Sequence, residues 1–125
     1  MEARVNEITG SIIGAALEAH SALGPGLLES AYEACLTFEL KSRGLKVESQ
    51  VELPVEYRGC RVECGYRIDL LVEDLVVVEL KAMDKIANFH AVQLLPYLKL
   101  SGEPAGLLIN FHEAHLRDGI KRMVI

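Results

Sequence analysis

The chain has 125 residues and a mass of 13.8 kDa, which is the size of one folding domain, so we expect residues 1–125 to form a single domain. A composition of 50% hydrophobic and 25% charged residues excludes disordered, collagen-like and coiled-coil chains. The longest uncharged apolar run, Leu75 to Val78, is far shorter than the roughly 20 residues that span a membrane, so no membrane partner is expected.

The charge balance limits how the chain can meet other molecules. Thirteen Lys and Arg residues against 18 Asp and Glu residues give a net charge of −5, which opposes loose electrostatic attraction to nucleic acid. The N-terminal residues lack the basic and apolar regions of a secretory signal, so we expect a cytoplasmic location. The three cysteines are an odd number, and reduced thiols fit that compartment.

The first part of the chain has the apolar pattern of two helices. Between Asn6 and Leu23, apolar side chains recur at intervals of three and four residues, which predicts an amphipathic helix. Gly24-Pro25-Gly26 predicts its end and a sharp turn, because proline cannot continue a helix. A second apolar stripe predicts a helix from Leu27 to Arg43, which Gly44 ends.

Beyond Gly44 the apolar pattern becomes alternating or continuous and the residues become β-branched, which predicts strands. Arg58-Gly59 has the composition of a hairpin tip, and Pro54 interrupts the first strand. The three main strands are predicted at Val47–Leu53, Cys64–Val72 and Leu75–Lys81, with a small hairpin that joins Val55–Tyr57 to Cys60–Val62.

The last part of the chain predicts one helix and two strands. The helix is expected from Ala87 to Leu100, with a kink where Pro96 removes a hydrogen bond to the Val92 carbonyl. The strands are expected at Gly106–Phe111 and Ile120–Ile125. The order α-α-β-β-β-α-β-β predicts an α/β fold of the α+β kind, in which helices flank a mixed β-sheet.

Three charged residues, Asp69, Glu79 and Lys81, interrupt the most apolar part of the chain. Charged side chains are rarely buried unless they are paired or bind a metal. Glu79 and Lys81 are two apart on one strand and therefore share a face of the sheet. If Val72 pairs with Val76 across a three-residue turn, Asp69 lies directly opposite Glu79. A two-residue turn would place the two carboxylates on opposite faces, unless a bulge restored the register.

Two carboxylates with open positions for water are the ligands that a hard divalent cation such as Mg²⁺ prefers. Such a cation stabilises charge on a phosphate and lowers the pKa of its bound water, and Lys81 is placed to orient that water or to hold a phosphate oxygen. The alternative is structural: Lys81 forms an internal ion pair with Asp69 or Glu79 that only balances the charges.

Several motifs in this order resemble a known family. Asp69, nine intervening residues and then Glu79-Leu80-Lys81 resemble the signature of the PD-(D/E)XK nuclease-like superfamily, which has a restriction-endonuclease-like core. Gly26-Leu27-Leu28-Glu29-Ser30-Ala31-Tyr32 resembles the motif of the GxxExxY family within that superfamily. The resemblance extends over nearly the whole chain and includes Asn110-Phe111 and Gly119-Ile120-Lys121-Arg122.

The resemblance implies a set of site residues. Asp69 and Glu79 would be metal ligands for Mg²⁺ or Mn²⁺, with the carbonyl of Leu80 as a further ligand, and Lys81 would be the catalytic lysine. Two helix residues would complete the catalytic set, namely Glu29, which reaches the metal directly or through water, and Gln93. The Pro-Asp pair that names the superfamily is replaced by Ile68-Asp69.

Spacing along the helices extends the candidate pocket to Tyr32, His90 and Tyr97, because Glu29 shares a helix face with Tyr32, and Gln93 shares one with His90 and Tyr97. Each has a structural alternative. Glu29 can interact with the helix N-terminus, the tyrosines can belong to the core, and His90 can be solvated or hydrogen-bonded.

The leading interpretation is a metal-dependent nuclease that hydrolyses phosphodiester bonds of DNA or RNA and binds nucleic acid weakly on its own. The alternative is a catalytically silent nuclease-like scaffold that acts as a binding module for protein or nucleic acid. The terminal strand also predicts a homodimer if its edge is unpaired. A zinc site built on Cys60 and Cys64 is disfavoured by their spacing across a predicted strand.

Overall fold

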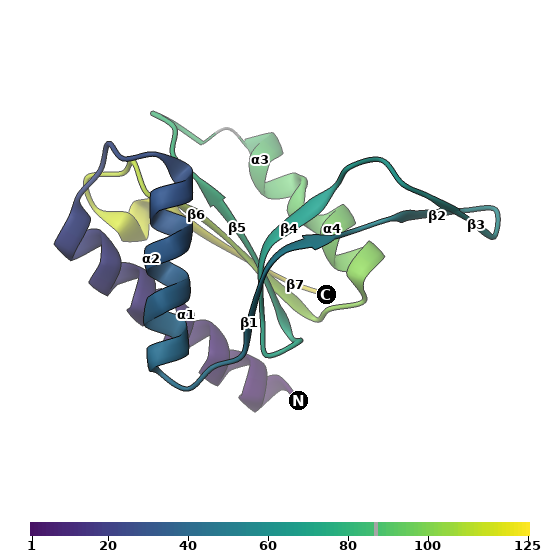
Figure 1. Ribbon diagram of the computed structural model, residues 1–125, viewed down its shortest axis with the longest axis horizontal. Coiled ribbons are helices and arrows are strands. Elements are labelled where there is room, and N and C mark those ends of the chain that lie inside the picture. Colours follow the sequence, from purple (N-terminus) through teal and green to yellow (C-terminus); the bar gives the residue numbers. More distant parts are fainter. Residues whose placement is uncertain (87) are drawn as a thin grey trace.

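A five-stranded mixed sheet organises the chain in the computed structural model, which describes residues 1–86 and 88–125 (Figure 1). The strand order is β1-β4-β5-β6-β7; among the described strands of this sheet, β5 and β6 pair in parallel and the other neighbours are antiparallel. The sequence elements are α1 (Glu2–Leu23), α2 (Glu29–Ser42), β1 (Val47–Glu52), β2 (Val55–Tyr57), β3 (Cys60–Val62), β4 (Arg67–Val72), β5 (Val76–Lys81), α3 (Asn88–Val92), α4 (Leu94–Ser101), β6 (Ala105–Asn110), the 3-10 turn η1 (Leu116–Gly119) and β7 (Ile120–Val124).

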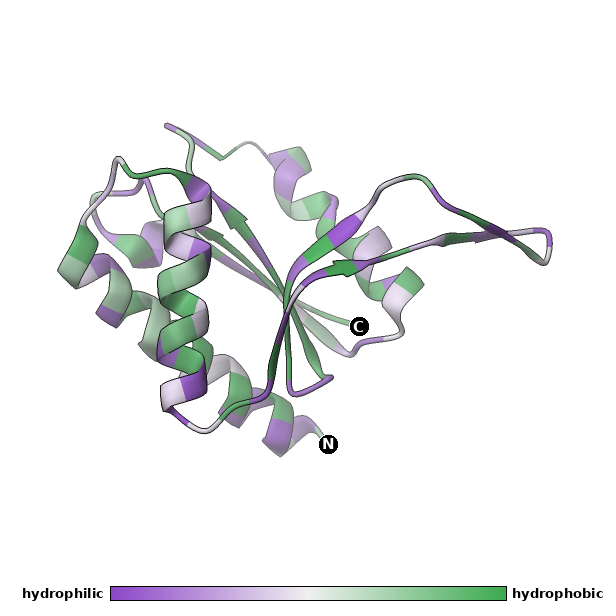
Figure 2. Ribbon diagram, viewed as in Figure 1, coloured by the Kyte–Doolittle hydropathy of each residue, from purple (hydrophilic) through white to green (hydrophobic). Residues whose placement is uncertain are grey.

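Helices cover both faces of this sheet, and each face has its own apolar cluster. Residues of α1 and α2 pack against one face, where Ile12, Leu36 and Leu80 are fully buried. Leu94 and Leu98 of α4 pack against the other face, over Val77. Figure 2 shows apolar and polar residues interspersed along α1 and α2, as an amphipathic pattern requires. The predicted mixed sheet flanked by helices is therefore confirmed.

Both N-terminal helices form, with shifted starts. α1 begins at Glu2 instead of Asn6, because Val5 continues the buried stripe and its amide donates to the Met1 carbonyl at 3.0 Å. α2 begins at Glu29 instead of Leu27, because the preceding residue is extended. No helix in the described residues is long and apolar enough to cross a membrane.

The predicted helix from Ala87 to Leu100 is two helices. α3 and α4 are separated by a turn at Gln93, and Ala87 lies outside the described residues. Pro96 stands in the first turn of α4, where its missing N–H leaves the Val92 carbonyl without the normal helical partner. The predicted disturbance at Pro96 is confirmed as a break between helices.

The predicted small hairpin is confirmed: β2 pairs with β3 around Arg58-Gly59, and both tip residues have positive φ. Figure 1 shows this hairpin at the end of an arm, residues 53–66, that projects from the rest of the molecule. A hydrogen bond of 2.9 Å from the Leu53 amide to the Tyr66 carbonyl closes the base of the arm. Cys64 therefore belongs to the arm, and β4 begins at Arg67 instead of Cys64.

The connection between β4 and β5 fixes the register of the two strands. Leu75 donates its amide to the Val72 carbonyl at 3.0 Å across Glu73 and Asp74, whose φ angles are 54° and 52°. This is a two-residue turn of the kind that hairpins favour. Leu75 then remains as an extra residue, so that Val72 pairs with Val76.

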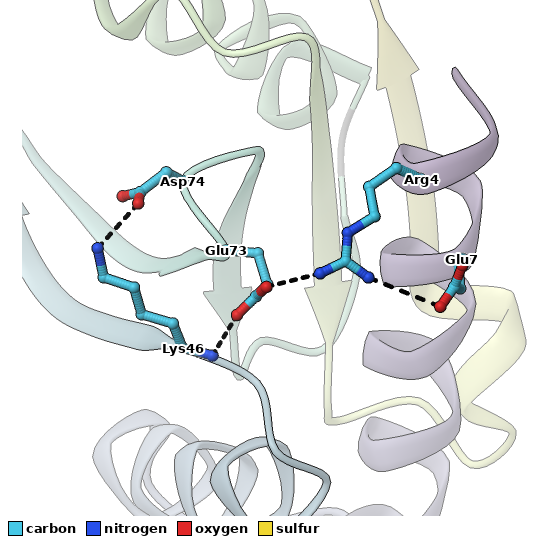
Figure 3. A network of polar contacts seen from close by, with 5 residues as sticks. All are labelled: Arg4, Glu7, Lys46, Glu73 and Asp74. Carbon is cyan, nitrogen blue, oxygen red and sulfur yellow. Dashed lines mark hydrogen bonds and ion pairs between the residues drawn. The ribbon is translucent and has the colours of Figure 1, made fainter. Parts of the chain in front are cut away.

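Contacts from two other segments hold this turn in place (Figure 3). Arg4 of α1 donates to Glu73 at 2.7 Å and forms an ion pair with Glu7 at 3.6 Å. The Lys46 amide donates to the other oxygen of Glu73 at 2.6 Å, and the Lys46 ammonium contacts Asp74 at 2.8 Å. The turn is therefore tied both to α1 and to the start of β1.

Candidate functional site

The register of β4 and β5 brings Asp69 opposite Glu79, as the three-residue connection predicts. The last paired residues are Leu70 with Val78, and one further step along both strands reaches Asp69 and Glu79. Beyond Leu70 the side chains take over the hydrogen bonding. Asp69 Oδ2 accepts from the Leu80 amide at 2.8 Å, and the Asp69 amide lies 3.4 Å from Glu79 Oε1.

The two carboxylates are half-buried and close together, which is costly for the charged form. Burial raises the pKa of Glu79 to about 9, with further contributions from the Asp69 charge and a side-chain hydrogen bond with Asp69. The positive charge of Lys81 opposes this rise. Glu79 therefore holds a proton at neutral pH when no other cation balances the pair.

Lys81 follows two residues after Glu79 on β5 and is half-buried. Among the ion pairs formed by residues 1–86 and 88–125, none includes Lys81. The predicted alternative of a closed internal ion pair is therefore wrong for these residues. The ammonium group acts on Glu79 and Glu29 only through longer-range charge.

Asp69 stands where β1 and β4 reverse the faces of their side chains. Residues two apart in a strand normally share a face, yet Leu70 packs under α1 and α2 whereas Ile68 packs under α4. In β1, Val47 and Val51 are divided between the same two clusters. Figure 1 shows both strands continuing from the sheet into the arm.

The partner of Asp69 on β1 is Gln50, a residue that sequence reasoning missed. Ser49 pairs with Leu70 and Val51 with Ile68, so Gln50 stands opposite Asp69. Gln50 has a φ of 54°, a left-handed conformation that is strained for a residue with a side chain. The sequence gives no signal for this conformation, because Gln50 looks like an ordinary polar position of a strand.

The Gln50 side chain joins Asp69 to helix α2. Its Nε2 donates to Glu33 Oε1 at 2.7 Å and lies 3.4 Å from Asp69 Oδ1. Ser49 Oγ donates to the other Glu33 oxygen at 3.2 Å. This amide therefore links Glu33 of α2, one helical turn beyond Glu29, to Asp69 of β4.

Glu29 lies in the first turn of α2 and is exposed. Its pKa is raised by partial burial, then by the charge of Asp69, while Lys81 acts in the opposite direction and Glu33 in the same one. The charges of Asp69 and Lys81 therefore act on Glu29. Glu29 is also the first residue of α2, where a carboxylate can interact favourably with the helix N-terminus, so the structural alternative stays open.

The donor set fits a hard divalent cation. The carboxylates of Asp69 and Glu79 offer oxygen atoms as ligands, and no ion pair among the described residues neutralises their charge. Both side chains are partly accessible to solvent. No group of three His, Cys, Asp or Glu side chains close enough to hold a metal lies within the described ranges. Asp69 and Glu79 therefore form a pair, and other ligands would come from backbone, water or Glu29.

A comparison with protein families decides the relationship. The chain matches the model of the PD-(D/E)XK nuclease superfamily over residues 6–123. The chain belongs to this superfamily. No curated protein and no solved structure matched it closely enough to count as a relative. PD-(D/E)XK nucleases generally use divalent metals, and the Asp69 and Glu79 pair lies inside the matched range.

Two of the predicted site residues on the helix after β5 line one cavity. Gln93 and Tyr97 line a cavity of about 350 Å³ between α4 and the base of the arm. Burial raises the pKa of Tyr97, and the charges of Glu79 and Asp69 raise it further. His90 is half-buried on α3 and its ring packs on Phe89 at 4.1 Å between ring centroids.

Tyr32 belongs to the core, as its structural alternative predicts. Its side chain is fully buried and stacks on Phe111, with ring centroids 4.5 Å apart. Its hydroxyl donates to the Gly24 carbonyl at 2.5 Å and accepts from the Leu27 amide at 3.1 Å. Tyr32 therefore fixes the loop before α2, and through it the position of Glu29.

Asn110 also holds a loop beside the site in position, in this case the loop that follows Lys81. It is fully buried next to Lys81 in the register of β5 and β6. Its side chain donates to the Met83 carbonyl at 2.8 Å and accepts from the Met83 amide at 3.1 Å. The loop that follows Lys81 is thereby held against β6. The Cys60 and Cys64 thiols are free and exposed.

We predict that Tyr32→Phe lowers the free energy of unfolding by about 1 kcal/mol, because it removes the partner of two backbone groups while it keeps the ring. Chemical denaturation measures the change. Tyr57→Phe is the matched control, since Tyr57 is 61% exposed and should change little. Equal stability of the two variants would contradict the structural role of the Tyr32 hydroxyl.

The backbone of Gln50 gives a second prediction. Gln50→Gly and Gln50→Ala both remove the amide, but only glycine accepts a φ of 54° without strain. The glycine variant should therefore be more stable than the alanine variant by about 1 kcal/mol. Thermal unfolding checks the order, and an alanine variant at least as stable as the glycine variant would show that this strain is absent.

The pKa of Glu79 gives a third prediction. Between pH 4.5 and about 9 the folded chain keeps a proton on Glu79 that the unfolded chain releases, so stability falls as the pH rises through this range. Glu79→Gln removes that loss. Without metal the variant should exceed the parent by several kcal/mol, up to about 5 kcal/mol, at pH 8 and match it near pH 4.

Urea denaturation at both pH values measures this difference, and Glu18→Gln, at an exposed position of α1, is the control. A Glu79→Gln variant that is destabilised equally at both pH values would contradict the protonated, cation-free pair.

Proposed function

We propose that this chain is a metal-dependent nuclease that hydrolyses phosphodiester bonds in nucleic acid. The observation that carries the proposal is the Asp69 and Glu79 pair, placed opposite each other with Lys81 on the same strand and without an ion pair to it. Within the superfamily we assign the chain to the GxxExxY family, on the motif from Gly26 to Tyr32.

Asp69 and Glu79 would hold Mg²⁺ or Mn²⁺, with the Leu80 carbonyl and Glu29 as further ligands. The bound cation would supply charge stabilisation at the phosphate and a more acidic water. The Leu80 amide keeps Asp69 Oδ2 in place at 2.8 Å, which leaves Oδ1 for the cation, steadied by Gln50. This is the ordering of a ligand by a hydrogen-bonding neighbour that metal sites commonly use.

Lys81 would act on the substrate. Its ammonium shares a sheet face with Glu79 and carries no ion-pair partner among the described residues, so it is available to orient a water molecule or to hold a phosphate oxygen. Gln93, on the other side of the site, would contact the substrate strand. In this arrangement the acids bind the cation and the two donors position the phosphate.

Two observations favour the alternative of a catalytically silent binding scaffold. The described residues contain no third acid close enough to complete a metal group, and the net charge of −5 opposes binding of bare nucleic acid. A cytoplasmic location and a homodimer stay predictions. For the dimer, β7 forms one edge of the five-stranded sheet, where a second strand can pair.

Calorimetry and cleavage separate the two functions. We expect Mn²⁺ to give a heat of binding with the parent chain, no heat with Asp69→Ala, and an undiminished heat with Lys81→Ala. On single- and double-stranded DNA and RNA with Mg²⁺ or Mn²⁺, we expect both variants to lose at least about a hundredfold in cleavage rate.

Lys41→Ala, in the last turn of α2, is the charge-matched control and should cleave as the parent does. If the parent shows neither a metal-dependent heat nor cleavage, the chain is a scaffold. If Lys81→Ala cleaves as fast as the parent, the role assigned to its ammonium is wrong.

A further inference from the structure

The cavity between the arm and α4 is built differently from the acidic pair beside it. Its volume is about 350 Å³, and none of the described residues that line it carries a carboxylate. The lining is formed by Val55, Tyr66, Gln93, Pro96, Tyr97 and Leu100. The walls are thus two phenol rings and aliphatic surface, with a single amide able both to donate and to accept.

The two tyrosines meet edge to face, with centroids 6.0 Å apart and an interplanar angle of 65°. Tyr97 is anchored, since it packs on the apolar cluster under α4. Tyr66 is 48% exposed and leaves part of its ring to solvent. An exposed aromatic ring fixed by a second ring is a platform on which another flat ring can stack.

The cavity adjoins the candidate metal-binding pair. Tyr66 precedes β4 by one residue and Asp69 by three, and Tyr97 lies over the sheet face that carries Val77 and Glu79. Burial is the main cause of the raised pKa of Tyr97, and the further rise from the charges of Glu79 and Asp69 agrees with this closeness. A ligand in the cavity would therefore lie close to the carboxylates of Asp69 and Glu79.

We propose that this cavity binds an unpaired nucleobase of the substrate, stacked on Tyr66 and hydrogen-bonded to Gln93. The proposal rests on the nuclease function above and names its substrate class as single-stranded nucleic acid, or a locally unpaired segment of a duplex. A base inside a duplex has both faces covered by its neighbours, so it cannot stack on a protein ring.

Electrostatics supports the same substrate class. With a net charge of −5, the chain gains little from phosphate contacts. Stacking of a base on an aromatic side chain contributes about 1–3 kcal/mol and does not depend on phosphate charge. The affinity of this chain for nucleic acid therefore depends on exposed bases, which single strands offer and duplexes do not.

The test is fluorescence anisotropy with labelled 12-residue oligonucleotides in Ca²⁺ and, separately, in EDTA. The probes are a single strand, the same strand with abasic residues at its centre, and the duplex, each as DNA and as RNA. The abasic strand keeps every phosphate, so it isolates the contribution of the bases. We expect the single strand to bind about tenfold more tightly than either other probe.

Tyr66→Ala should remove this preference, and Tyr66→Phe should keep it, because stacking needs the ring and not the hydroxyl. Tyr57→Ala, at an exposed tyrosine of the arm outside the cavity, is the matched control and should bind as the parent does. A parent that binds the abasic strand as well as the intact one, or that binds none of the probes, would overturn the proposal.

The nuclease function and the base-binding cavity can be refuted independently of each other. Asp69→Asn should keep the base-dependent binding in EDTA while it loses cleavage. Base-dependent binding without any metal-dependent cleavage by the parent would leave the cavity assignment standing and refute the nuclease. Cleavage of single strands and duplexes at equal rates, with no loss in Tyr66→Ala, would refute the cavity assignment and leave the nuclease standing.

Discussion

Two acidic side chains from adjacent strands lie close together in this molecule, and no positively charged side chain among the described residues forms an ion pair with either of them. Asp69 and Glu79 are half-buried, and their proximity favours a proton on Glu79. A fold gains no stability from such an arrangement, because burial of like charges costs free energy that a neutral pair would not. The cost is explained if the chain binds a cation that balances the charge of Asp69 and Glu79 when the protein functions.

The rest of the structure holds this pair in position. The connection at Glu73 and Asp74 sets the register, and contacts from α1 and from the start of β1 hold the connection. The left-handed residue Gln50 redirects β1 opposite Asp69 and links it to α2. The site thus depends on segments that are far apart in sequence. The strained backbone of Gln50 beside it is of the kind found at functional sites.

Much of this arrangement could be predicted from residue types. Apolar periodicity and the Gly and Pro signals located the helices and strands, and Arg58-Gly59 located the hairpin tip. The position of Asp69 opposite Glu79 could be predicted by counting residues across the turn, provided that three residues separate Val72 from its partner Val76. The turn itself combines a two-residue hairpin loop with an extra residue, Leu75, which is the bulge that the alternative allowed.

Other features could not be predicted because they depend on contacts between distant residues. The face reversal at Gln50 and Asp69 has no sequence signal, since strand periodicity assumes extended backbone throughout. Spacing placed Tyr32 beside Glu29 on one helix, but only the packing on Phe111 and the bonds to the loop before α2 show that its role is structural. The projection of the arm, and the cavity at its base, depend on the same tertiary contacts.

The most direct test of this account is a crystal of the chain grown with Mn²⁺ and measured at a wavelength where manganese scatters anomalously. The account predicts an anomalous peak between the carboxylates of Asp69 and Glu79, with the Lys81 ammonium outside the coordination shell. A map with no peak there, and with the Lys81 ammonium bonded to both carboxylates, would contradict it.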